Sequence, residues 1–332
     1  MSGLKKELAL ELYRHFDDLE RYASGISEDS AELYAETEIK IRELIYSIAG
    51  VKIGNDYKSE RLLAEFKKKI SEIRYNVADN VLNLIDGITG DVIESETDFW
   101  LMFMLLAFNE NGKRFGKDEI GKIKKYGKYH GLTIKQIIEK VIDGDVQRIY
   151  EVTVNDLING KPLEDVLRDI EKESNKTKRN IRNEVNAVID GVSNDASLAF
   201  AVKNKAYLLY LSMLDDRVCG ECSSHNGEMY NYNSPDIPYL PVHIRCRCHL
   251  IPIVSPESVN PEDYDVTFKE YFGTMNETEK ATRIGYSKYV GYKSGIEEIT
   301  KFVDVPKSAR MSLNDMTKRD KNMLRKGCQQ GK

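Results

Sequence analysis

Long stretches of the chain repeat apolar residues every three or four positions, which is the period of an amphipathic helix. The clearest stripe between residues 5 and 90 consists of Leu63, Phe66, Ile70, Ile73, Val77, Val81 and Leu84. Lysines and glutamates fill the other faces, so the stripe must pack against a partner in the same chain or in another. Packing within the chain is the first expectation, and an oligomeric helical collar is the alternative.

An apolar run of ten residues, Phe99 to Phe108, follows this stripe. Because a bilayer-spanning helix needs roughly 20 apolar residues, the run predicts a buried helix. Further helical stripes follow between residues 132 and 173, which predict two or three short helices. Asn159-Gly160-Lys161-Pro162 is a stop signal with a fresh start at the proline. Residues 178–203 predict one helix, or two with a break near Gly191.

The period changes at Ala206. Residues 206–214 form a strand-like apolar run, Asn226-Gly227 is a hairpin signal, and residues 249–254 predict a last short strand. Helical stripes return over residues 264–304, and the basic, polar tail from Thr317 is expected to fray. The pattern therefore predicts an α+β fold that is mostly α-helical, with a small antiparallel sheet between helical regions.

Four segments are expected along the 332 residues. They are N-terminal long helices at 1–110, a helical linker at 111–177, a core with the small sheet at 178–256, and a C-terminal helical segment with the basic tail at 257–332. Hydrophobic residues make up 41% and charged residues 31%, values that favour a folded protein over a disordered one.

The charge balance limits the partners that the whole surface suits. The net charge of −5 excludes a surface built throughout to coat nucleic acid. Residues 112–128 are locally basic and rich in glycine, and we expect a solvated loop there, with a DNA contact as the alternative. The first residues contain no signal-peptide core, so export is not expected.

Five potential metal ligands lie between residues 219 and 248. Cys219-Gly220-Glu221-Cys222 is followed, after 20 residues, by His243-Ile244-Arg245-Cys246-Arg247-Cys248. A CxxC places two sulfurs on one tight turn, and a second cluster from a distant turn completes a tetrahedron. The spacing predicts one structural zinc ion, which would stabilise a sheet too small to have a core of its own.

The ligand set is left open by the spacing. Four of Cys219, Cys222, His243, Cys246 and Cys248 are needed. Cys246 and Cys248 have side chains on the same side of an extended strand, so both are able to ligate. Equally, His243 and Cys246 make a knuckle and leave Cys248 in the core, and we favour the participation of His243.

Two other uses of the cysteines were weighed. A redox dithiol usually follows a strand and opens a helix, whereas the residues after Cys222 are polar and turn-rich. Two disulfides would need an oxidising compartment. His225 is expected to be exposed, His249 to be a surface group or to lie behind the ligands, and Cys328 in the tail to be a free thiol.

Three segments together resemble a known family: Leu214 to Cys222, Asn226 to Tyr230, and His243 to Cys248. They are similar to the MuF family of phage head morphogenesis, or minor head, proteins, which resemble protein F of phage Mu. The family has a D-x-R-x-C-x-x-C turn, a hairpin and an H-P-N-C-R-C cluster. Here Ile244-Arg245 replaces the Pro-Asn. Including weaker flanking motifs, the resemblance covers roughly residues 115–315.

The resemblance also implies residue roles. Arg182-Asn183-Glu184 is similar to the family's Arg-Thr-Glu signature, with Asn in place of Thr. It implies that Arg182 and Glu184 anchor a helix to the sheet through an ion pair, with Asp216 or Arg217 as partner.

The function that the resemblance implies is that of a minor capsid protein of a tailed phage or prophage. Such a protein associates with the portal and the capsid interior, contacts portal, scaffold or major capsid protein, and assists head assembly and DNA packaging or ejection. It is not an enzyme and involves no membrane. Phage DNA is a further partner through local basic patches. The alternative is a zinc-stabilised HNH-type nuclease that uses His225, Asn226 and His243.

Overall fold

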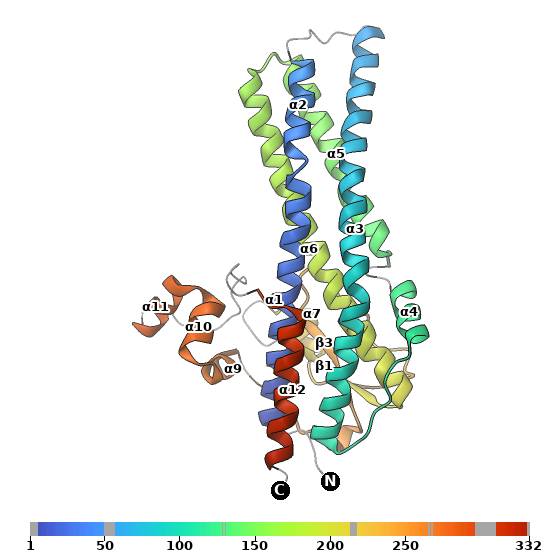
Figure 1. The fold of residues 1–332 in the computed structure, drawn as a ribbon, viewed down its shortest axis with the longest axis vertical. Helices are drawn as coiled ribbons and strands as arrows, with labels where there is room; N and C mark the ends of the chain where they lie inside the picture. Colours follow the sequence, from blue (N-terminus) through green and yellow to red (C-terminus); the bar gives the residue numbers. More distant parts are fainter. Residues whose placement is uncertain are drawn as a thin grey trace. The chain divides into compact units, whose positions relative to one another are not determined.

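The computed structural model of the chain describes residues 6–49, 57–127, 129, 131–212, 218–264, 266, 268–295 and 310–330. The fold is mostly α-helical with one small antiparallel sheet, as predicted (Figure 1). The long helices are α1 (Lys6–Ala35), α2 (Glu38–Ile48), α3 (Tyr57–Phe108), α4 (Lys117–Tyr126), α5 (Ile134–Ile158) and α6 (Leu163–Asn204). The following elements are β1 (Tyr207–Ser212), α7 (Gly220–Ser224), β2 (Met229–Asn231), β3 (Cys248–Ile253), η1 (Pro256–Ser258), α8 (Pro261–Tyr264), α9 (Phe268–Thr274), α10 (Glu277–Ile284), α11 (Tyr286–Lys293) and α12 (Leu313–Gln330).

The chain divides into two compact units. Unit 1 comprises residues 1–25, 88–130 and 186–332, and unit 2 comprises residues 26–87 and 131–185. Neither unit is continuous in sequence, because α1, α3 and α6 each contribute residues to both.

Unit 2 is a helical bundle whose core includes the stripe predicted on α3. Phe66, Ile70, Val77 and Val81 are each at most 3% exposed. This confirms the expectation that the stripe packs within the chain. The buried face is turned slightly from the predicted one, because Arg74 and Ile85 are buried in place of Ile73 and Leu84.

A charged pair lies at the centre of this bundle. Arg74 Nε is 2.9 Å from Asp145 Oδ2, and both side chains are fully buried. The guanidinium lies 3.9 Å from the centre of the Tyr34 ring. Thr177 donates a hydrogen bond of 2.7 Å to the second carboxylate oxygen of Asp145. Because both charges have partners, the desolvation of each is offset inside the protein.

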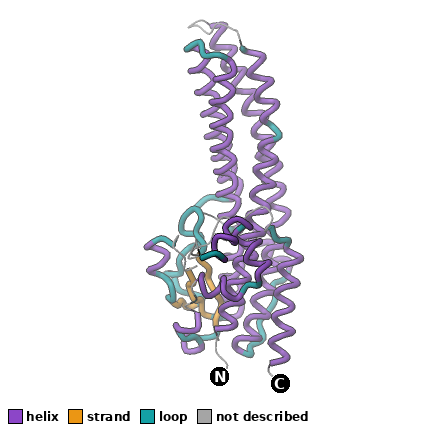
Figure 2. Tube along the Cα trace, turned by 90° about the vertical axis from the view of Figure 1, so that its left-hand side faces the viewer, coloured by secondary structure: helices purple, strands orange, loops and turns teal. Residues whose placement is uncertain are grey.

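Unit 1 is built around the three-stranded sheet, whose order is β2-β1-β3 (Figure 2). The central strand β1 pairs antiparallel with both neighbours, with Tyr207 opposite Asn231 and Ile253. Nearly all residues of β1 and all of β3 are buried, so both faces of these strands are covered. The main aromatic core comes from α1 and α3 and consists of Phe16, Phe99, Trp100 and Phe103.

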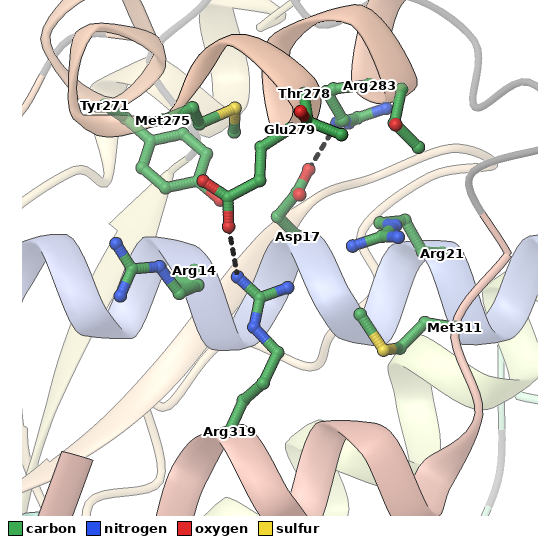
Figure 3. A pocket seen from close by; sticks show the side chains of 11 residues that line it. Arg14, Asp17, Arg21, Tyr271, Met275, Thr278, Glu279, Arg283, Met311 and Arg319 are labelled. Carbon is green, nitrogen blue, oxygen red and sulfur yellow. Dashed lines mark ion pairs between the residues drawn. The ribbon is translucent and has the colours of Figure 1, made fainter. Parts of the chain in front are cut away.

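Helix α12 docks onto unit 1 mainly through charges, so the expected frayed tail is wrong for this segment. Arg319 lies 2.7 Å from Asp18, and Asp320 lies 3.3 Å from His15. Met316 is its one fully buried apolar side chain among residues 313–322. A cavity of about 190 Å³ lies beside α12 and is lined in part by Arg319. Ion pairs join Asp17 to Arg283 and Glu279 to Arg319 there (Figure 3).

Two local expectations are also wrong. Residues 117–126 of the expected basic loop form helix α4, whose inner side presents Ile120 and Ile123. The expected break near Gly191 is absent, because α6 is continuous from Leu163 to Asn204. A Cβ at Gly191 would lie 2.0 Å from the Tyr129 ring, so this glycine permits close packing rather than a bend.

The buried run at the end of α3 matches its prediction. Phe99, Phe103 and Phe108 are at most 7% exposed. Among the described residues, no helix is both long enough and apolar enough to cross a membrane.

Candidate metal centre

Two tight turns of unit 1 present the potential ligands. Cys219 caps the N-terminus of the one-turn helix α7, and its sulfur accepts the Cys222 N–H at 3.3 Å. The second turn is closed by a hydrogen bond of 3.0 Å from the Cys246 N–H to the His243 carbonyl. Each turn therefore places two ligand residues three positions apart on one side of the chain.

The two turns meet so that their side chains converge. His243 Nε2 lies 3.2 Å from the sulfur of Cys219 and 3.2 Å from that of Cys222. The Cys222 and Cys246 sulfurs are 3.8 Å apart. Ligand atoms of Cys219, Cys222 and His243 lie within 4.8 Å of one another, and so do those of Cys222, Cys246 and Cys248. Cys222 belongs to both groups and is the centre of the cluster.

These distances fit a zinc ion. Two sulfurs at about 2.3 Å from zinc, at a tetrahedral angle, are roughly 3.8 Å apart, and a sulfur and a nitrogen are roughly 3.6 Å apart. The sulfur pair matches this spacing, and the sulfur–nitrogen pairs are slightly closer. The cavity lined by Cys219, Cys222, His243 and Cys248 has a volume of about 10 Å³, room for a single atom rather than an organic cofactor. Thiolates with one imidazole form a donor set that zinc prefers.

The imidazole is oriented for this role by the backbone. His243 Nδ1 lies 2.9 Å from the carbonyl oxygen of Ile244. A carbonyl only accepts, so Nδ1 carries the proton and the lone pair of Nε2 faces the sulfurs. This backbone hydrogen bond also raises the pKa of His243.

The thiols differ in how readily they ionise. The hydrogen bond from the Cys222 N–H lowers the pKa of Cys219, while burial raises that of Cys222 to about 12. Hydrogen bonding from the Cys248 thiol lowers the pKa of Cys246 to about 5, and the same bond raises the pKa of Cys248. Cys248 begins strand β3 and lines the same small cavity as Cys219, Cys222 and His243. The four cysteines of the cluster are free thiols.

Asn194, on α6, joins the helix to the strand that follows the ligands. Its side-chain oxygen accepts the Leu250 N–H at 2.9 Å, and its amide nitrogen donates to the Cys248 carbonyl at 3.2 Å. Asn194 is 3% exposed. The sequence did not single out this residue, because Asn194 stands among other polar residues such as Ser193, Asp195 and Ser197.

Arg182 has Glu28 as its partner among the described residues. Its guanidinium contacts the Glu28 carboxylate of unit 2 at 2.5 and 3.0 Å, and the side chains are 35% and 18% exposed. Glu184 is half-buried and has contacts of its own. Asp216 and Arg217 lie outside the described residues, so the ion pair that joins the helix to the Asp-Arg turn stays a prediction.

The other two histidines of this region belong to neither group of converging ligands. His225 is partly exposed and forms an ion pair with Glu228 at 2.6 Å. The expectation of His249 as a surface group is wrong, because the residue is 5% exposed and its ring centroid stacks 3.7 Å from that of Phe16. Burial lowers the pKa of His249 to about 3, so the ring is neutral in the core. Nothing is described of the Cys328 side chain.

Residues 147–251 match the family model described as Phage Mu protein F like protein. This stretch is a Mu protein F-like region. It extends from the second half of α5 to β3 and includes both ligand turns, and it occupies the centre of the interval that the resemblance indicated. No curated protein and no solved structure matches the chain.

Proposed function

We propose that this protein is a minor head protein of a tailed phage or prophage. It is a virion component of the capsid interior near the portal, made in the host cytoplasm, where it assists head assembly and DNA packaging or ejection. The observation that carries the proposal is the Mu protein F-like region at residues 147–251.

The metal centre has a structural role in this proposal. Cys219, Cys222, His243 and Cys246 hold one zinc ion, and Cys248 is the fifth potential ligand, beside the same cavity. A fully protein-ligated tetrahedron leaves no open position for substrate, which is the pattern of structural rather than catalytic zinc. The ion joins the CxxC turn to the segment that enters β3.

The nuclease alternative has less support. Each of its three residues has another role in the structure. His225 forms an ion pair with Glu228, and His243 contacts the thiols. The Asn226 side chain accepts the Ser212 N–H at 2.9 Å, which secures the end of β1. A catalytic histidine needs a metal-bound partner beside it, and the described residues offer none next to His225.

The N-terminal helices supply a surface for portal or scaffold protein in this proposal. Their long stripe is buried in unit 2, so the contact must use other side chains. Ile39 and Tyr46 are 67% and 58% exposed and lie two turns apart on one face of α2. Exposed apolar residues that share a face are typical of protein contacts.

Particle incorporation tests the proposal. The full-length chain is co-expressed with the portal, scaffold and major capsid proteins of its phage or prophage, and procapsids are purified and quantified by mass spectrometry. A head protein is recovered at a few copies per particle. Ile39→Asp/Tyr46→Asp lowers the recovery.

The matched control is Tyr286→Asp/Val290→Asp on α11, which also replaces exposed apolar residues, 75% and 44% exposed. It is incorporated like the wild type. Absence of the wild-type chain from particles contradicts the head role. Equal incorporation of the α2 variant keeps that role and moves the contact to another surface. A truncation near Gly112 is unsuitable, because it removes the parts of α1 and α3 that belong to unit 1.

A further inference from the structure

Two segments distant in sequence form one basic surface on unit 1. Residues 110–125 and 203–205 carry eight basic side chains against three acidic ones, on a chain whose net charge is −5. The basic residues are Lys113, Arg114, Lys117, Lys122, Lys124, Lys125, Lys203 and Lys205. The excess of positive charge is therefore local, and the remainder of the chain is strongly acidic.

Specific contacts fix the two segments together. The Lys113 N–H donates to the Asn204 side chain at 2.6 Å. Lys203 Nζ pairs with the Glu119 carboxylate at 2.5 Å, and Phe115 packs edge-on against Phe200 of α6. The loop before α4, α4 itself and the end of α6 therefore present their lysines on a common, ordered surface.

The charges that this surface does not neutralise face solvent. The exposed side chains of Lys113, Lys117 and Lys205 form no ion pair with any described residue. On α4, Gly121 lies one turn from both Lys117 and Lys125, and a Cβ there would meet nothing within 4 Å. A glycine inside a helix is unfavourable, and this one makes no packing contact. Because Gly121 has no side chain, the backbone of a ligand is able to approach the helix closely between Lys117 and Lys125.

Lys205 occupies a position where glycine is usual. It follows the C-terminus of α6 with a φ of 54°, and the next N–H, of Ala206, bonds to the Ala201 carbonyl at 2.9 Å. This is the left-handed helix cap that normally selects glycine. A lysine there adds an exposed positive charge to the surface where local backbone preference argues against it.

We propose that this basic surface binds the phosphate backbone of double-stranded DNA. Lysines are point charges that suit phosphates without reading sequence. Single-strand binding relies on aromatic stacking platforms, and the described side chains of residues 110–125 and 203–205 include no exposed aromatic. The choice of DNA rests on the proposed function, since the head encloses duplex DNA, whereas the affinity for polyanions rests on the charges alone.

Fluorescence anisotropy of the full-length, zinc-loaded protein tests the proposal with a labelled 30-base-pair duplex of arbitrary sequence over a range of salt concentrations. We expect sequence-independent binding that weakens as salt rises. Lys113→Gln/Lys117→Gln/Lys122→Gln lowers the affinity at least tenfold. Each lost phosphate contact reduces the slope of log affinity against log salt by about 1, so the triple variant reduces it by about 3.

Two comparisons separate binding from folding and from net charge. Lys40→Gln/Lys58→Gln/Lys140→Gln removes three exposed lysines of unit 2 and the same total charge, and it binds like the wild type. Lys205→Gly relieves the left-handed backbone, so it keeps or raises the melting temperature while it lowers the salt slope by about 1.

Several results would overturn the proposal. These are no duplex binding at low salt, equal loss in the two triple variants, or binding to polyglutamate that is at least as tight as binding to DNA. The last result identifies an acidic protein as the partner instead. Particle incorporation is measured separately, so a head protein that fails to bind DNA is distinguishable from a chain with no role in the head.

Discussion

The bundle of unit 2 and the ligand turns of unit 1 satisfy buried polar groups in opposite ways. Arg74 and Asp145 complete each other, with Thr177 and the Tyr34 ring around them. The cysteines and His243 instead converge on one another around a small cavity that Arg245 and Arg247 also line. The centre of unit 2 is therefore completed by its own residues, whereas the ligand turns have, in our proposal, a zinc ion at their centre.

Zinc removal gives the largest difference between the two regions. Wild-type protein purified under reducing conditions contains one zinc per chain. Cys222→Ser loses the zinc ion, because Cys222 belongs to both ligand groups. The loss of zinc removes a stabilisation of the sheet on the order of 10 kcal/mol. Elemental analysis and hydrogen exchange of β1 and β3 measure the two effects, while unit 2 keeps its protection.

The same assay decides the fourth ligand. Cys246→Ser loses zinc, whereas Cys248→Ser and the control Cys328→Ser retain it. Retention of zinc in Cys246→Ser together with its loss in Cys248→Ser would exchange the roles of these two residues. A wild-type protein without zinc would remove the metal from the proposal altogether.

The second effect concerns the pair at the centre of unit 2. Arg74→Met leaves Asp145 charged and buried, which costs about 3–5 kcal/mol of folding free energy. Arg74→Met/Asp145→Leu recovers most of this loss, because no uncompensated charge remains. Hydrogen exchange of α3 and α5 residues within unit 2 measures the change. A single variant as stable as the wild type would mean that water reaches Asp145.

A smaller effect is expected at the helix-to-sheet contact of unit 1. Asn194→Ala leaves the Leu250 N–H and the Cys248 carbonyl without their side-chain partner. We expect this to cost about 1–3 kcal/mol of folding free energy. Zinc loss to a chelator becomes faster, because Cys248 adjoins the ligand turn. The control Asn175→Ala, on the exposed side of α6, does not change either quantity. Equal rates of zinc loss in Asn194→Ala and the wild type would mean that this contact of β3 does not affect the metal centre.

The smallest effect is expected at Arg182. Its pair with Glu28 is partly open to solvent, so Arg182→Ala costs about 1 kcal/mol or less rather than the value of a buried pair. A double-mutant cycle with Glu28→Ala measures the interaction. A cost above about 3 kcal/mol would point to a second, buried partner.

The sequence predicted the features of the fold that depend on neighbouring residues. The apolar period placed the stripe of α3, and the apolar run at the end of that helix, in a core. The cysteine spacing predicted both ligand turns. What it did not predict depends on partners from distant segments. Gly191 ends no helix because Tyr129 packs on it, and Arg74 is buried because Asp145, 71 positions later, completes it.

Asn194 and the lysine surface show the same limit. Nothing in the neighbourhood of Asn194 indicates that β3 will need two hydrogen bonds at that point. The segment at 112–128 was recognised as basic, but its helical form depends on Ile120, Ile123 and Phe115 packing, and on Lys203 from the end of α6. The type of a residue was readable from the sequence, and its partner was not.

The contact of α12 with α1 determines the order in which the chain is able to fold during synthesis. His15 and Asp18 leave the ribosome about 300 residues before their partners Asp320 and Arg319. Unit 2 is complete once residue 185 has emerged, whereas unit 1 must wait for α12. Such long sequence separations slow folding and prolong the exposure of unpaired surface. We therefore expect nascent chains to contain a folded bundle beside an unfinished sheet and aromatic core, and to need chaperones mainly for unit 1.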